Sequence, residues 1–224
     1  MENTCDGEYH FMRTTWVLTS IVSILLGFSL TSQAAPTAAN TARDPQALIH
    51  GAVEELRMAI VHDKMAINTD PNRAITLVDR IVLPHVDTNR VGRLILGQYW
   101  RNATPEQRRQ FVDNYRRLLL RTYAVHVSDY ADVKVDYLSS GGTTNNSKRT
   151  FVRTRVSHAG NPASNVDYRM YLTANGWKVY DVAVTGISLV ATFRVTVNSE
   201  INRYGLDGLI ARLIEKNSRP LTHY

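Results

Sequence analysis

The chain has 224 residues, of which 44% are apolar and 21% charged, and its formal net charge is +6. At this length it can bury a sizeable core as one domain, or as one domain with a subdomain. The basic balance fits a solvated surface, an anionic membrane or an acidic partner, and the export signal described next argues against DNA.

The N-terminus has the order of a secretory signal peptide. The stretch Trp16–Leu30 is uncharged and mostly apolar, Arg13 precedes it, and Ser32-Gln33-Ala34 forms a small-x-Ala cleavage site. The apolar run is about 15 residues, short for the ~20 of a bilayer span, so a retained membrane anchor is the lesser alternative. We therefore predict a signal peptide over residues 1–34, with translation starting at Met1 or Met12.

Cleavage would leave a mature chain without cysteine, because Cys5 is the only one in the sequence. An exported protein without disulfides depends on its core for stability. Removal of residues 1–34 leaves 25 basic and 17 acidic residues, a formal charge of about +8.

After a short Ala/Thr linker over residues 35–43, four capping side chains indicate helix starts. They are Asp44, Asp70 and Thr104, each followed by proline, and the weaker Asp87. Thr104 and Gln107 together form a capping box.

Apolar residues at helical spacing follow each cap and predict four helices. Their stripes are Leu48, Val53, Leu56, Ile60 and Met65; Ile75, Leu77, Val78, Ile81 and Val82; Val91, Leu94, Ile95 and Tyr99; and Phe111, Tyr115, Leu118, Leu119 and Thr122.

The period then changes to two. Four runs alternate as strands do, within residues 132–138, 150–158, 165–172 and 177–184, and Asn175-Gly176 indicates a type I′ turn between the last two. Helices followed by consecutive strands predict an α+β fold with an antiparallel four-stranded sheet over residues 131–185.

Residues 184–205 fit both a strand and a helix. Alternation stops at Val197, whereas a helical stripe of Val190, Phe193, Val197, Ile201 and Tyr204 continues. We predict a helix that Ser188 caps and Gly205 ends, a second helix to residue 216, and a tail over 217–224.

Catalytic and metal-binding patterns are weak. Gly186-Ile187-Ser188 has only half of a nucleophile elbow. The candidate metal ligands are scattered without metal-ligand spacing: His50, His62, His85, His126 and His158. Asp181 is the one acid inside an apolar strand, and we interpret it as a hydrogen-bonded structural carboxylate. No pattern in the sequence therefore argues for an enzyme.

Four stretches taken in order resemble the MlaC family of periplasmic phospholipid-binding, or toluene-tolerance auxiliary, proteins. They are "DRIVLPHVD", "LILGQYWRNATPEQRRQFVDNYRRLLLRTYA", "GWKVYDVAVTGISLVATFR" and "YGLDGLIARL", and the resemblance covers about residues 44–216. It implies an NTF2-like curved sheet wrapped by helices, with a helical subdomain and a cavity for acyl chains. It also implies that the protein is not an enzyme and needs no metal or redox cofactor.

The resemblance also implies a function: a periplasmic carrier that moves phospholipid between an MlaA-type outer-membrane lipoprotein complex and the MlaD-type subunit of an inner-membrane ABC transporter. Alternatives are a hopanoid or other isoprenoid lipid carrier, an NTF2-like enzyme using Asp181, and an interaction module with a solid core.

Within this resemblance we expect two sets of functional residues. The expected lipid contacts are Leu94, Ile95, Tyr115, Leu119, Val133, Val135, Val152, Val156, Tyr168, Met170, Leu172, Ile187 and Val190. The arginines that could steer the protein to anionic partners are Arg108, Arg109, Arg116, Arg117 and Arg121.

Overall fold

The computed structural model of the chain describes residues 44–123, 127, 131–138, 148–158, 162–219 and 221. The predicted signal peptide and linker, residues 1–43, lie outside the described residues, as do residues 139–147, between the first two predicted strands.

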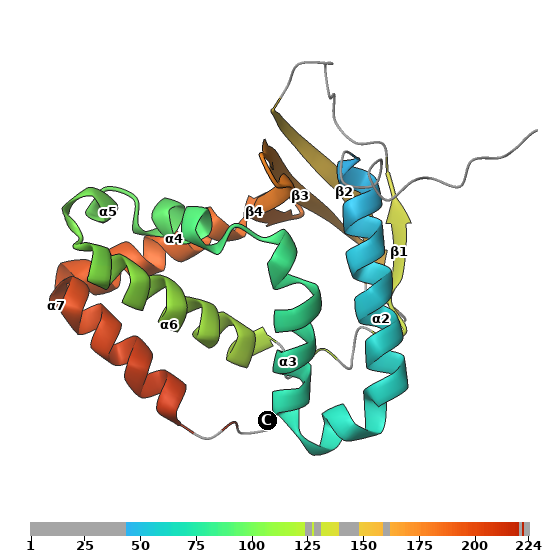
Figure 1. Ribbon diagram of the computed structural model, residues 1–224, viewed down its shortest axis with the longest axis horizontal. Coiled ribbons are helices and arrows are strands. Elements are labelled where there is room, and N and C mark those ends of the chain that lie inside the picture. The colour runs from blue at the N-terminus through green and yellow to red at the C-terminus, as the bar shows by residue number, and fades with distance from the viewer. Residues whose placement is uncertain are drawn as a thin grey trace, which may run out of the picture. The chain divides into compact units, whose positions relative to one another are not determined.

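Two long helices, α2 (Pro45–Thr69) and α3 (Pro71–Ile81), form an antiparallel pair, followed by the short 3-10 helix η1 (Leu83–His85) (Figure 1). Both predicted caps are confirmed, since the Asp44 and Asp70 carboxylates accept from the second backbone N–H of their helices at 2.9 and 3.0 Å. Met65 does not face the core as predicted: it is 86% exposed, and Ile67 is buried in its place.

The next three helices are α4 (Thr88–Leu96), α5 (Tyr99–Asn102) and α6 (Pro105–Tyr123). The Asp87 side chain accepts from the Arg90 backbone N–H at 2.9 Å and so caps α4. The capping box is confirmed, with reciprocal bonds of 3.1 and 2.9 Å between Thr104 and Gln107.

The sheet is antiparallel in the order β1-β2-β3-β4-β5. Its strands are β1 (Lys134–Tyr137), β2 (Arg149–Ser157), β3 (Ser164–Thr173), β4 (Gly176–Val184) and β5 (Ile187–Ser188). The α+β class is confirmed, but the described sheet has five strands where four were predicted. Thr185 (φ 48°) and Gly186 (φ 86°) turn the chain back so tightly that Ile187 and Ser188 pair with the end of β4.

The β3–β4 turn also differs from the prediction. A type I′ turn needs positive φ at both central residues. Here Gly176 has φ 94°, but Asn175 is not among the described residues with positive φ. Thr173 pairs with Gly176, so Gly176 is the first residue of β4 and not a central residue of the turn. The predicted type I′ turn at Asn175-Gly176 is therefore wrong.

The ambiguous stretch is helical, as predicted, within α7 (Leu189–Ser218). The Ser188 hydroxyl accepts from the Ala191 N–H at 3.0 Å and caps the helix. Gly205 (φ 71°, ψ 173°) breaks the helical backbone, which then continues to Ser218, two residues past the predicted end. Val197 and Ile201 are buried before the break, and Leu209 and Leu213 after it.

Three hydrophobic clusters organise these elements. One joins α4, α6 and α7, which lie together on one side of Figure 1. A second lies between α2 and α3. The third joins the start of α2 to the sheet, around Val152, Met170 and Trp177. No helix in the described part of the chain combines the length and apolar character needed to cross a bilayer.

Candidate functional site

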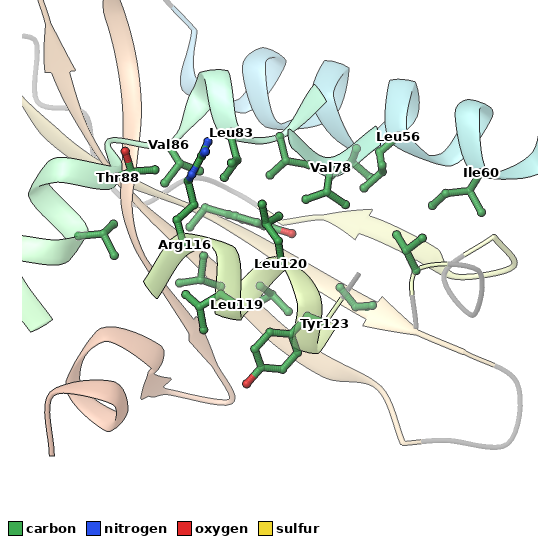
Figure 2. A pocket seen from close by; sticks show the side chains of 18 of the residues that line it. Leu56, Ile60, Val78, Leu83, Val86, Thr88, Arg116, Leu119, Leu120 and Tyr123 are labelled. Carbon is green, nitrogen blue, oxygen red and sulfur yellow. The ribbon is translucent and has the colours of Figure 1, made fainter. Parts of the chain in front are cut away.

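A cavity of about 580 Å³ lies between the helices and one face of the sheet. Figure 2 shows α2 and η1 side chains facing those of α6 across it. It is lined by Val53, Leu56, Arg57, Ile60, Val78, Val82, Leu83, Val86, Thr88, Val91, Gly92, Val112, Tyr115, Arg116, Leu119, Leu120, Tyr123, Val127, Val133, Val135, Val156, Val166, Tyr168 and Val182. Its volume is in the range of ~300–1,000 Å³ that small-molecule sites occupy.

The sheet wall follows from strand alternation and register. Val135 lies opposite Val156 across β1 and β2, and Tyr168 lies opposite Val182 across β3 and β4. Opposed residues project to the same face of an antiparallel sheet, so these side chains form a continuous apolar surface.

The helical walls follow from spacing of three and four residues. On α6, Val112, Tyr115 and Leu119 repeat at this spacing, and on α2 Val53, Leu56 and Ile60 do the same. Gly92 allows α4 to approach α6 closely, because a Cβ there would lie 2.6 Å from Cγ2 of Val112.

The only charged residues in this lining are two arginines. Arg57 pairs with Glu54 and Arg116 with Asp79, each at 2.9 Å. The Nε of Arg116 is buried and has no hydrogen-bond partner among the described residues. The cavity therefore combines an apolar wall with two guanidinium groups, each already paired with a carboxylate.

The remaining polar groups of the lining are hydroxyls. Burial raises the pKa of Tyr115 and of Tyr168, so both phenols stay neutral at physiological pH. Thr88 and Tyr123 add two more hydroxyls. This lining offers hydrogen bonds and apolar contact, without a carboxylate or imidazole for acid–base chemistry.

Asp181 lies outside the cavity lining. Its carboxylate pairs with Arg169 at 2.8 Å and accepts from the Ser188 hydroxyl at 2.7 Å and the Val190 N–H at 3.1 Å. This is the structural carboxylate that the sequence indicated, and it fixes the start of α7 on β4. In the described part of the chain no three His, Cys, Asp or Glu side chains gather as a metal site would require.

The structure brings six of the thirteen predicted lipid contacts to the cavity: Tyr115, Leu119, Val133, Val135, Val156 and Tyr168. The other seven lie elsewhere. Ile95 and Val190 pack in the α4–α6–α7 cluster, and Val152 and Met170 in the sheet cluster. Leu172 and Ile187 are 40% and 64% exposed, and Leu94 lines a second pocket.

One cause explains why the other seven predicted contacts do not line the cavity. Strand and helix periods show which side chains are inward, but an inward side chain can meet either a packed cluster or a cavity. The same limit explains why α2, α3 and η1 were missed as a wall, with Leu56, Val78 and Val86. Arg57 and Arg116 could have been noticed as cations beside apolar stripes.

The predicted steering arginines are mostly engaged. Arg108 donates to the Trp100 and Arg101 carbonyls, Arg109 pairs with Glu106 at 2.7 Å, and Arg121 donates to the Arg219 carbonyl. Arg116 lines the cavity and pairs with Asp79. Of the predicted set, Arg117 alone is exposed and has no ion pair or side-chain hydrogen bond with another described residue.

Comparisons with known proteins agree on one family. The model of the MlaC protein family matches residues 51–215. The intermembrane phospholipid transport system binding protein MlaC of Haemophilus influenzae is 27% identical over 202 residues, 88% of this chain and 93% of that protein. The toluene tolerance protein ttg2D of Pseudomonas putida is 28% identical over 191 residues, 84% of this chain and 87% of that protein.

A solved structure extends the agreement to three dimensions. A phospholipid-binding protein from Ralstonia solanacearum, determined in complex with a phospholipid, matches with a TM-score of 0.72 and 31% identity, over 78% of this chain and 97% of that one. The fold and the family match together show that the chain belongs to the MlaC family.

Proposed function

We propose that this chain is a periplasmic phospholipid carrier that holds acyl chains in the cavity between its helices and its sheet. The observation that carries the proposal is the lining itself: a wall of valine and leucine side chains whose only charged groups are Arg57 and Arg116. Support comes from the Ralstonia solanacearum relative, which was solved with a phospholipid bound.

The energetics explain why such a lipid needs a carrier. Two C16 chains carry ~30 methylenes, and burial of each is worth ~0.8 kcal/mol, so release into water would cost on the order of 20 kcal/mol. A protein that lowers this cost must present a comparable apolar surface. Unloading then needs a partner that stabilises a conformation with a smaller cavity.

The two arginines favour a phosphate-bearing lipid over an uncharged one. A guanidinium binds phosphate oxygens through paired N–H donors. Arg57 and Arg116 bring two guanidinium groups to the lining of the cavity. A hopanoid or other uncharged isoprenoid has no phosphate for these guanidinium groups to bind.

The transport route follows from the family. We propose that lipid passes between an MlaA-type complex at the outer membrane and an MlaD-type subunit of an inner-membrane ABC transporter, as part of an Mla-type system. The relative in Haemophilus influenzae carries the name of such an intermembrane transport system.

Native mass spectrometry of the protein purified from cells tests the proposal. The wild-type chain should carry an added mass equal to a phospholipid. Val166→Trp places an indole in the cavity and should abolish the adduct, whereas Val195→Trp, the same change at a position that is 72% exposed, should retain it.

An adduct with the mass of an uncharged isoprenoid would replace the phospholipid assignment with the alternative carrier. A wild-type protein that stays empty and takes up no lipid from vesicles would contradict the carrier function altogether. Circular dichroism of both variants confirms that the tryptophans leave the fold intact.

A further inference from the structure

A second pocket, of about 330 Å³, lies where α4, α5 and α7 meet. Its lining is Arg93, Leu94, Gly97, Trp100, Arg101 and Arg194. None of these residues lines the large cavity, so the two sites are separate. Half of the lining residues are arginines, and the lining contains no acidic residue.

A backbone carbonyl of α4 fixes the side chain of Arg194 at this pocket. Gly97 ends α4 with φ 56°, and the Arg194 side chain passes 3.6 Å from where a Cβ of Gly97 would stand. The Nε of Arg194 donates to the Leu94 carbonyl at 2.6 Å. One edge of the guanidinium is thereby anchored to the C-terminal end of α4, and its terminal nitrogens are left for another acceptor.

Arg108 fixes the opposite side from α6. It donates to the Trp100 carbonyl at 3.0 Å and to the Arg101 carbonyl at 3.3 Å, and its guanidinium lies 5.2 Å from the centre of the Trp100 ring. These bonds from Arg108 therefore fix the position of the short helix α5, which carries Trp100 and Arg101.

The arginines of the pocket differ from seven others in the described part of the chain, which are neutralised by acidic side chains. Arg57, Arg109, Arg116, Arg153, Arg169, Arg212 and Arg219 each pair with a carboxylate. Within the same described residues, Arg93 and Arg101 make no ion pair or hydrogen bond through their side chains. Three like charges around one small concavity repel one another, and a bound anion would relieve that repulsion.

We propose that this pocket binds the phosphate group of an anionic lipid head group at a membrane surface. Guanidinium forks match phosphate geometry, and three arginines line this pocket. The half-buried Trp100 adds an amphipathic ring of the kind enriched at membrane interfaces. A concavity formed by six residues suits one anionic group, whereas an acidic protein partner would need an extended surface.

Vesicle co-sedimentation with the full-length mature protein tests this site. Wild-type protein should bind vesicles of phosphatidylglycerol and phosphatidylcholine and should bind pure phosphatidylcholine poorly. The double variant Arg93→Gln/Arg101→Gln should lose about 25-fold in affinity for the anionic vesicles, because each basic residue at such a surface contributes about fivefold.

The matched control is Arg73→Gln/Arg80→Gln, which removes the same charge from two exposed positions of α3. It should retain vesicle binding to within about twofold, since scattered surface charges are screened by salt. Native mass spectrometry of lipid in the large cavity should be unchanged in both double variants, which separates this inference from the proposed function.

Inorganic phosphate should compete with the vesicles more strongly than chloride at equal ionic strength, because the site recognises the phosphate group. Equal losses in the two double variants, or equal competition by the two salts, would show only general charge attraction and overturn the proposal. It would also fail if inorganic phosphate bound while the vesicles did not, or if the Arg93/Arg101 change weakened binding to polyglutamate alone.

Discussion

At the scale of single residues, Asp181 illustrates how one buried carboxylate connects its own strand, β4, to three neighbouring elements. Its side chain is 5% exposed, and its two oxygens accept from β3, β5 and α7 through Arg169, Ser188 and Val190. Because both oxygens are used, the carboxylate fixes the direction in which α7 leaves the sheet. The neighbouring pair Arg153–Asp167 has similar geometry, at 2.6 Å, and links only β2 and β3.

Replacement of Asp181 by alanine should destabilise the protein by about 2–3 kcal/mol, because it leaves the buried Val190 N–H without its acceptor and Arg169 without its partner. Urea unfolding measures this free energy. Asp167→Ala is the matched control and should cost about 1 kcal/mol or less, since that pair is more exposed. Equal losses in the two variants would contradict the anchoring role of Asp181.

His85 should make the stability of the protein fall on mild acidification. Burial, and then the nearby positive charge of Lys178, lower the pKa of His85 below its ordinary value of 6.5. The unfolded chain then takes up this proton first, so the contribution is complete above about pH 6.5 and is lost as the pH falls through the lower folded-state pKa.

His85→Gln should therefore flatten the dependence of the unfolding free energy on pH between about 7.5 and 5. His62→Gln, at a side chain that is 86% exposed, should leave the slope as in the wild type. A slope that does not change in His85→Gln would assign the acid sensitivity to other groups.

At the scale of elements, local signals in the sequence predicted the helices well. The caps Asp44, Asp70 and Ser188 and the capping box at Thr104 depend on a few neighbouring residues, and all are present in the structure. The two-residue strand β5 was missed because the turn at Thr185 and Gly186, rather than any periodicity, creates it. Six of the thirteen predicted contacts line the cavity. The rest could not be separated in advance, because whether Val152 or Val156 meets open space depends on how the helices are placed over the sheet.

The break in α7 offers a test of backbone strain in one element. Gly205 has φ 71° and ψ 173°, a region that only glycine occupies readily, and a Cβ there would meet no atom within 4 Å. Gly205→Ala should therefore cost about 1–3 kcal/mol through the backbone alone. Gly51 in α2, where a Cβ also meets nothing, is the control, and Gly51→Ala should stabilise by about 0.5–1 kcal/mol.

Thermal or urea unfolding of the two variants should therefore shift in opposite directions. If Gly205→Ala were as stable as the wild type, α7 could run as a continuous helix, and the break would not be needed to fold its second half onto α6.

At the scale of the whole described domain, the cavity lies between three hydrophobic clusters that remain separate from one another. Its lining draws on each: Val112 and Tyr115 from the α4–α6–α7 cluster, Ile60 from the α2–α3 cluster, and Tyr168 and Val182 from the sheet cluster. Most domains have one contiguous core with small satellites. Here the contacts that would join the clusters are absent, and a bound acyl chain would supply them.

This arrangement predicts that lipid stabilises the protein as a whole. A ligand that binds only the folded state adds about 2.7 kcal/mol at 100 times its dissociation constant, and about 1 kcal/mol raises Tm by ~2–4 °C for a domain of this size. Delipidated wild-type protein should therefore gain roughly 5–10 °C in Tm on saturation with a short-chain phospholipid below its micelle concentration.

Val166→Trp should begin with an equal or higher Tm than the delipidated wild type, because its indole already joins the clusters, and it should gain little on addition of the same lipid. Val195→Trp should respond as the wild type does, since its side chain lies outside the cavity. A full thermal shift in Val166→Trp would place the lipid outside the cavity, since the ligand would then stabilise the protein without occupying the space between the clusters.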